Sequence, residues 1–204
     1  MTPNERSDYL LKEHLELIIN CADELSHKIA ALSETVTQTL LSDGKVFTLG
    51  NGPCAPIAEI LANSMVDQFE RERPGFPAIC LSNEHSLISQ YAKERRFNEL
   101  AARKLRTLGA ENDMLILLSI EGDCSNLVQA MQTAHDKGMA VALITGPNSS
   151  NLASIMDSND LEICLGSNTK SRVIEFQMIS INILLDLIDC ALFGPPTESP
   201  EEPA

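Results

Sequence analysis

The segment Met114–Leu118 is the most restrictive feature of the sequence, because it contains no polar residue. A strand that is apolar at every position has both faces buried, and such strands occur in parallel sheets with helices on both sides. The segment ends at Ser119 and leads through Glu121-Gly122-Asp123 into a helical stretch over 125–137. A strand, a tight glycine-containing loop and a helix therefore follow one another here.

The same order of elements recurs along the chain. Residues 45–49 form a short β-rich run that ends in Gly50-Asn51-Gly52-Pro53, and a helical stretch follows over 55–68. Further strands are predicted at 77–81, 140–145 and 161–165, and further helices at 85–91, 97–108 and 171–193. Strands that alternate with helices predict a three-layer, doubly wound, flavodoxin-like α/β fold with a parallel sheet.

The N-terminal residues carry a long apolar stripe. Between Leu11 and Leu40 apolar residues recur in steps of three and four, which predicts a long helix or a pair of helices. The stripe is about 45 Å long at about 1.5 Å per residue and exceeds the face of one small domain, so we expect a neighbouring subunit to cover part of it. The chain then divides into a helical region for oligomer packing (1–42), an α/β domain (43–193) and a disordered acidic, proline-rich tail (194–204).

Composition narrows the class of protein. The chain has 204 residues, of which 44% are hydrophobic, enough for one domain with a substantial core. Its net charge of −14 argues against general binding to nucleic-acid phosphates. Lysines and arginines nevertheless gather in 93–106, a stretch that is more typical of a solvated helix face than of a docking patch.

The cysteines and the apolar runs indicate the compartment. The six cysteines are widely separated and show no C-x-x-C spacing, which predicts neither disulfides nor a zinc-thiolate site. No apolar run approaches the roughly 18 residues of a membrane span, and the N-terminus is polar. A cytoplasmic protein without a membrane partner is expected.

Two glycine loops mark the place where a ligand would bind. The loops 50–54 and 119–124 each connect a strand directly to a helix. Glycine lets backbone N–H groups approach an anion, and the dipole of the following helix favours negative charge, so a phosphate site is plausible. A tight turn between strand and helix also uses glycine, so the pattern alone leaves both interpretations open.

Several motifs together resemble the sugar isomerase (SIS) family. They are Gly50-Asn51-Gly52, the segment 69–74 leading to Pro77-Ala78-Ile79, the strand 113–119 with Gly122, and Gly138 with Leu143-Ile-Thr-Gly146. The resemblance covers nearly the whole chain outside the tail. It implies a homo-oligomer, expected to be a tetramer, and points to two branches: the sedoheptulose 7-phosphate isomerases and the DnaA initiator-associating proteins.

The isomerase branch is expected to carry metal-binding and proton-transfer residues that this chain lacks. The resemblance places histidine and glutamate one turn apart on the helix after the first glycine loop, and glutamine and histidine on the last helix. Here those positions hold Ile60, Ser64, Ile174 and Asn182. Isoleucine cannot ligate a metal, and neither serine nor asparagine is a credible general base at neutral pH. We therefore expect no catalytic residues, no metal and no cofactor.

The second glycine loop also departs from the isomerase pattern of roughly Ser-Thr-Ser-Gly-Asn-Ser. A pair of like charges about 5 Å apart at an effective dielectric near 20 costs roughly 3 kcal/mol, whereas a helix dipole contributes about 0.3–1 kcal/mol. Glu121 and Asp123 should therefore weaken phosphosugar binding, although both residues could simply cap the next helix. The predicted pocket residues are Asn51, Gly52, Cys54, Ser64, Ser119, Glu121, Asp123 and Cys124.

The other local matches favour the initiator-associating branch. Asn63-Ser64-Met65 has serine where the isomerase glutamate stands, and the helix ends in Leu192-Phe193 before a short polar tail. In that branch the Leu-Phe pair is associated with self-assembly and initiator binding, so Leu192 and Phe193 are candidate partner contacts; they could equally be the last apolar turn of a packed helix.

Three functions follow from these residues. The first is a non-catalytic adaptor that binds a DnaA-type initiator and meets DNA only through it. The alternatives are a phosphoheptose isomerase and a phosphosugar sensor without turnover. Of the four histidines, His85 alone lies near the predicted cleft and is kept as a possible site residue.

Overall fold

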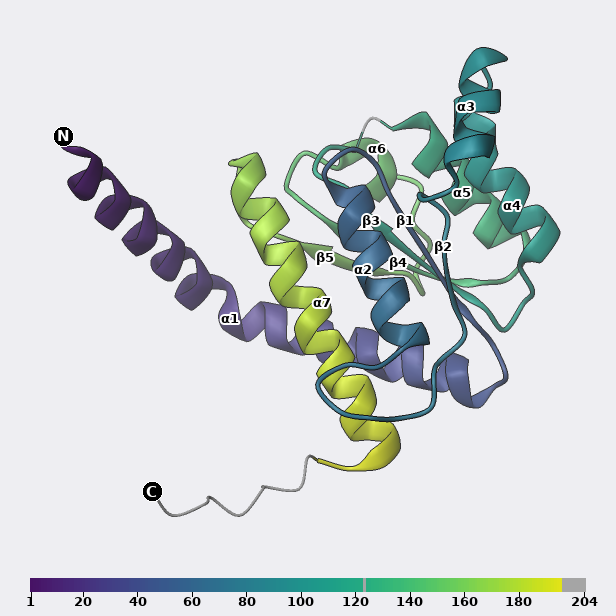
Figure 1. The fold of residues 1–204 in the computed structure, drawn as a ribbon, viewed down its shortest axis with the longest axis horizontal. Helices are drawn as coiled ribbons and strands as arrows, with labels where there is room; N and C mark the ends of the chain where they lie inside the picture. The colour runs from purple at the N-terminus through teal and green to yellow at the C-terminus, as the bar shows by residue number, and fades with distance from the viewer. Residues whose placement is uncertain (123, 196–204) are drawn as a thin grey trace.

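A five-stranded parallel sheet forms the centre of the protein (Figure 1). The structure is a computed structural model and describes residues 1–122 and 124–195. The strand order is β2-β1-β3-β4-β5, which confirms the doubly wound, flavodoxin-like prediction. The strands are β1 (Val46–Gly50), β2 (Ala78–Cys80), β3 (Met114–Leu118), β4 (Ala140–Thr145) and β5 (Leu161–Cys164).

Helices cover both faces of the sheet. One core cluster joins the sheet to α1 (Pro3–Leu41), α2 (Cys54–Val66) and α7 (Lys170–Phe193). The other joins it to α4 (Leu100–Leu108), α5 (Ser125–Asp136) and the short α6 (Ser150–Ala153). Helix α3 (His85–Lys93) has no buried residue and rises beside α4 at the edge of the molecule (Figure 1).

Strand β3 lies at the centre of the core, as its uniformly apolar sequence predicts. All five of its residues are buried. Met114, Ile116 and Leu118 face the cluster of α1, α2 and α7, whereas Leu115 and Leu117 face the opposite cluster. The alternation of side chains along a strand therefore serves two apolar layers at once.

The N-terminal stripe forms one helix of 39 residues. Thr2 caps α1 in a capping box with Glu5, which satisfies the first free backbone N–H groups. Leu25 is the first residue of α1 that is buried, and the part before it, 3–24, begins beyond the body of the domain (Figure 1). Towards its end this part contacts the domain, because Leu17, Ile18 and Cys21 pack against the core cluster and His14 stacks on Phe176 of α7. We call this part the α1 arm. Leu11, Leu15 and Ile19 on the arm are 67%, 58% and 73% exposed.

Helix α7 is long and apolar. By length and mean hydropathy it alone among the described helices could span a membrane, which corrects the expectation from sequence that no segment comes near this limit. In the fold it packs as a core helix, because Gln177 is fully buried and its amide donates hydrogen bonds to the carbonyls of Ser119 and Ile144. Those carbonyls lie at the carboxyl ends of β3 and β4. Helix α7 is therefore bonded to the end of the sheet where a ligand is expected.

Helix boundaries differ from the sequence prediction in two places. The predicted helix 97–108 begins as a 3-10 turn, Phe97–Glu99, before α4 starts. The four-residue α6 was not predicted, because it is too short to show a period. Gly138 does end α5 as expected: its φ is +72°, in the left-handed region that glycine adopts most easily. Of the predicted disordered tail, 196–204 lie outside the described residues.

Candidate functional site

The strand order reverses between β1 and β3, so the loops that follow these strands meet at the usual ligand position of such a sheet. Across this point the side-chain amides of Asn51 and Asn126 pair reciprocally. Each amide nitrogen donates to the other amide oxygen at 2.8 Å. One N–H donor and one acceptor site of the predicted pocket residue Asn51 are therefore engaged within the protein.

The loop after β1 is fixed by short backbone contacts. The N–H of Gly50 donates to the Ser82 hydroxyl at 3.0 Å, and that hydroxyl donates to the Gly50 carbonyl at 2.9 Å. A Cβ atom at Gly50 would lie 2.4 Å from the Cys54 carbonyl oxygen, so only glycine fits there. Gly52 has φ of +52° and turns the chain into α2.

Two of the donors in the loop after β3 are also engaged within the protein. The Ser119 hydroxyl donates to the Glu121 carbonyl. The N–H of Gly122 donates to the Asn148 carbonyl at 2.8 Å, which joins this loop to the one after β4. The Cys124 thiol makes a weak contact of 3.9 Å with the Glu121 carbonyl. Asp123 lies outside the described residues.

Glu121 has a cationic partner that the sequence did not reveal. Its carboxylate lies 2.7 Å from Nζ of Lys170, the first residue of α7. Both side chains are exposed, so the pair is screened by solvent, but the lysine offsets part of the negative charge of this loop. The repulsion between Glu121 and a phosphate is therefore smaller than expected from sequence.

A cavity of about 200 Å³ opens at the carboxyl ends of β1 and β2. Of the predicted pocket residues Asn51 and Gly52 line it, and the other ten lining residues are mostly apolar: Leu49, Gly50, Ala55, Leu81, Ser82, Ile88, Phe97, Leu100, Ala101 and Asn126. His85 is the exposed first residue of α3 and is not among them. The cavity therefore offers little charge to hold a phosphosugar.

Ser64 is not brought to this cavity. It lies in the last turn of α2, ten residues beyond Cys54, which corresponds to about 15 Å along the helix. Its carbonyl accepts a hydrogen bond from Arg73 at 2.8 Å. The structure therefore gathers Asn51, Gly52, Cys54, Ser119, Glu121 and Cys124 near the reversal point and leaves Ser64 at the far end of α2.

The positions where the isomerase branch is expected to hold a metal do not fit one. Ile60 and Ser64 lie on α2, and Ile174 and Asn182 lie on α7. Two of these side chains are aliphatic and supply no ligand atom. Nowhere in 1–122 and 124–195 do three or more His, Cys, Asp or Glu side chains come together as a metal site requires.

Cys54 is the most perturbed thiol near the reversal point. It is 1% exposed, and burial raises the pKa of its thiol to about 11, with a smaller opposing effect from a hydrogen bond to Gln177 and a further rise from the Cys124 thiol. A thiol with this pKa is neutral at physiological pH and is a poor nucleophile. Cys54 is therefore an inert, buried group at the start of α2.

The raised pKa of Cys54 predicts a pH dependence of stability. Because the folded pKa is above the ordinary value of 9.0, the neutral thiol stabilises the fold fully below pH 9, and this stability is lost as the pH rises towards 11. We expect the loss to be about 2–3 kcal/mol in the free energy of unfolding. Urea denaturation at several pH values should show it, and Cys54→Ala should have a flatter profile. Equal slopes in the two proteins would contradict the prediction.

Gly122 predicts a second stability effect. A Cβ atom there would lie 2.5 Å from the backbone carbon of Ser149, too close for the two loops to stay joined. We expect Gly122→Ala to lower the free energy of unfolding by about 1–3 kcal/mol. Gly166→Ala is the matched control, because no atom lies within 4 Å of its added Cβ. Thermal denaturation of both variants would test this, and equal stabilities would disprove it.

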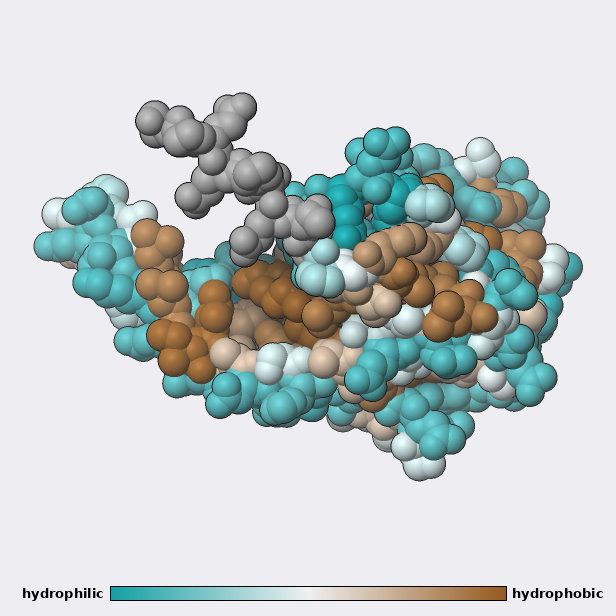
Figure 2. Space-filling view, turned by 90° about the horizontal axis from the view of Figure 1, so that it is seen from below, coloured by the Kyte–Doolittle hydropathy of each residue, from teal (hydrophilic) through white to brown (hydrophobic). Residues whose placement is uncertain are grey.

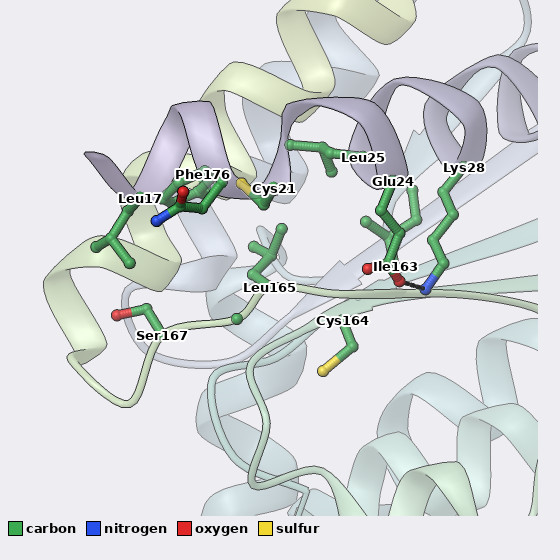
Figure 3. A pocket seen from close by; sticks show the side chains of 12 residues that line it. Leu17, Cys21, Glu24, Leu25, Lys28, Ile163, Cys164, Leu165, Ser167 and Phe176 are labelled. Atoms are coloured by element: carbon green, nitrogen blue, oxygen red, sulfur yellow. Dashed lines mark ion pairs between the residues drawn. The ribbon is translucent and has the colours of Figure 1, made fainter. Parts of the chain in front are cut away.

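A second cavity, of about 240 Å³, lies between α1, the end of β5 and the start of α7 (Figure 3). Figure 3 shows Leu17, Cys21 and Leu25 of α1 above Leu165, with the ion pair of Glu24 and Lys28 at one side, 2.8 Å apart. Burial raises the pKa of the thiols of both Cys21 and Cys164. Sequence reasoning did not find this cavity, because its residues come from segments more than a hundred positions apart.

The C-terminal end of α7 is held by two arginines that sequence reasoning used only as family markers. Nε of Arg73 donates to the Asp189 carboxylate at 2.6 Å, and the same guanidinium donates to the carbonyls of Ser64 and Met65 at 2.8 and 3.0 Å. Arg73 is 2% exposed, so this is a buried ion pair. It joins the end of α2 to the last turns of α7.

Leu192 and Phe193 have different environments. Leu192 packs against the core cluster of α1, α2 and α7. Phe193 is 47% exposed, and its ring stacks on Phe76 with ring centres 6.0 Å apart. The guanidinium of Arg71 lies 5.5 Å from the centre of the Phe193 ring. Of these two residues, only Phe193 therefore presents a large apolar surface to solvent.

Two of the six basic residues in 93–106 form ion pairs within the fold. Arg96 pairs with Glu94 and Glu99, and Lys104 pairs with Glu84. These pairs favour a solvated helix face over a docking patch, as the sequence pattern indicated.

Known proteins resemble this chain over most of its length. The SIS domain family matches residues 10–146. The phosphoheptose isomerase of Chromohalobacter salexigens is 36% identical over 166 residues, 81% of this chain and 84% of that protein. The DnaA initiator-associating protein DiaA of Klebsiella pneumoniae is 34% identical over 181 residues, which are 89% of this chain and 92% of that protein. A phosphoheptose isomerase from Francisella tularensis has the same fold, with a TM-score of 0.87 and 28% identity over 93% of this chain and 99% of that one. This chain belongs to the SIS domain family.

Proposed function

We propose that this protein is a non-catalytic cytoplasmic adaptor that binds a DnaA-type replication initiator and promotes its assembly at the origin. The observation that carries the proposal is the absence of a general base or a metal-ligand set at Ile60, Ser64, Ile174 and Asn182. A relative with 34% identity is a DnaA initiator-associating protein. The candidate partner contact of the chain lies on its surface, where Phe193 is half exposed.

We further propose that the α1 arm joins subunits into a homo-oligomer, expected to be a tetramer. Figure 2 shows apolar residues along the arm and on the adjoining body, with a hollow between them. Leu11, Leu15 and Ile19 lie on one stripe of the arm, and Ile183 on α7 is 42% exposed. Exposed leucines and isoleucines at this density are typical of an interface. An adaptor with several subunits could hold several initiator molecules together.

Titration of the purified protein against purified DnaA tests the adaptor. We expect a complex in the micromolar range or tighter, and DNA in the complex only when DnaA is present. Size-exclusion chromatography with light scattering would report the mass of the oligomer in the same sample. Absence of a complex at micromolar concentrations would overturn the proposal.

The second candidate function is a phosphoheptose isomerase. The isomerase relative with 36% identity favours it. Turnover of sedoheptulose 7-phosphate, lost on changing Ser64 or Asn182, would establish it. Calorimetry with the same sugar distinguishes a sensor, which would bind without turnover. The hydrogen bonds that already occupy Ser119 and Gly122 lead us to expect neither heat nor turnover.

A further inference from the structure

We propose that Arg71 and Phe76 are positioning residues that hold the side chain of Phe193 in place for the partner. The inference rests on the proposed function, in which Phe193 contacts the initiator. Neither residue belongs to the last helix: both come from the segment between α2 and β2. The partner group expected on the free face of Phe193 is an apolar or aromatic side chain.

The first step is the stack around Phe193. The rings of Phe76 and Phe193 are 6.0 Å apart and 12° from parallel. Arg71 lies 5.5 Å from the Phe193 ring centre, and its Nη1 donates to the Gly194 carbonyl at 2.9 Å. Aromatic stacking and cation–π contacts each favour one ring orientation. Arg71 therefore holds both the ring and the backbone carbonyl that follows it.

The second step is the support behind the stack. Asp189, one turn before Phe193, accepts a hydrogen bond from the buried Arg73 at 2.6 Å, and its other oxygen lies 3.8 Å from Nε of Arg71. Arg73 also lies 4.0 Å from the centre of the Phe76 ring. The two arginines and the two phenylalanines therefore form one unit, fixed to α7 through Asp189.

The third step is exposure. Phe193 keeps 47% of its surface in solvent although its ring contacts Phe76 and Arg71, and Arg71 is 25% exposed. At the end of a helix a half-exposed phenylalanine would ordinarily move among rotamers. A ring that is fixed before binding loses less conformational entropy in the complex, which increases affinity. The arrangement suits a contact residue more than a packing residue.

A fluorescence experiment tests the positioning without any partner. The chain has no tryptophan, so Phe193→Trp introduces a single indole reporter. We expect Arg71→Met or Phe76→Ala in this background to raise the acrylamide quenching constant about twofold and to lower the anisotropy, because the ring loses its contacts. Arg71→Lys keeps the charge, so its quenching constant should lie between those of the parent and Arg71→Met. Arg103→Met, at an exposed arginine elsewhere, is the control. Quenching equal to the parent in both variants would overturn the positioning role.

A double-mutant cycle against DnaA tests its purpose. We expect Arg71→Met to weaken binding about threefold to tenfold in the native chain and to have no effect in the Phe193→Ala background, because Arg71 acts through Phe193. Equal effects in both backgrounds would overturn the inference and leave the adaptor intact. Failure of the unmodified protein to bind DnaA would instead overturn the proposed function, while the quenching result would still decide whether Arg71 positions Phe193.

Discussion

Asp189→Ala should lower the free energy of unfolding by about 3–5 kcal/mol, because it removes one partner of a buried ion pair. The Asp189 carboxylate is 4% exposed and accepts the 2.6 Å hydrogen bond from Arg73, which is 2% exposed. Removal of the carboxylate leaves a guanidinium buried without a counter-charge, and water cannot reach it. Chemical denaturation followed by circular dichroism would measure the loss.

Asp186→Ala is the matched control for this prediction. Asp186 lies three residues earlier on the same helix, is exposed, and makes only a weak contact of 3.8 Å with the Cys190 thiol. Its replacement should change stability by less than about 0.5 kcal/mol. The double variant Arg73→Met, Asp189→Leu should regain much of the loss, since it buries no charge. A loss below about 1 kcal/mol for Asp189→Ala would show that the pair does not support the end of α7.

Phe193→Ala should weaken binding to DnaA by roughly 30-fold or more and leave the fold intact. Buried aromatic anchors at interfaces typically contribute about 2 kcal/mol or more when truncated. Phe193 is half exposed before binding and belongs to the last turn of α7, so its loss removes little of the core. Surface plasmon resonance with immobilised DnaA would measure the dissociation constant.

Phe97→Ala is the control for the binding experiment. Phe97 is 40% exposed, close to the 47% of Phe193, but it lies on the 3-10 turn before α4. Its replacement removes a similar apolar surface and should leave DnaA binding within about twofold of the parent. Similar losses for both variants would indicate nonspecific apolar contact, and no loss for Phe193→Ala would remove Phe193 from the interface.

The sheet could be predicted from sequence because its strands carry strong and local signals. Met114–Leu118 is apolar at every position, and glycine loops follow β1 and β3. The α6 turn could not be predicted, because four residues show no period. The steps of three and four between Leu11 and Leu40 predicted a long helix or a pair of helices, and the structure has one helix, which begins at Pro3.

Less of the candidate site could be predicted from the sequence. The loops near the reversal point follow from the topology, but their hydrogen bonds do not, since Asn51 pairs with a residue 75 positions later. The Lys170 partner of Glu121 lies on α7, 49 positions later, and lowers the expected repulsion. Arg73 and Asp189 are 116 positions apart and show no pattern that would join them. Local periodicity reports burial, whereas pairings between distant residues depend on the folded chain.

The position of α7 has a consequence for biosynthesis. This helix is the last element of the described chain, yet Gln177 supplies hydrogen bonds to the ends of β3 and β4 and its apolar side covers the same face as α1 and α2. A nascent chain still lacking α7 leaves that face open to water and to other nascent chains. We therefore expect folding to be completed only after α7 has left the ribosome, and the open apolar face to be a binding surface for chaperones until then.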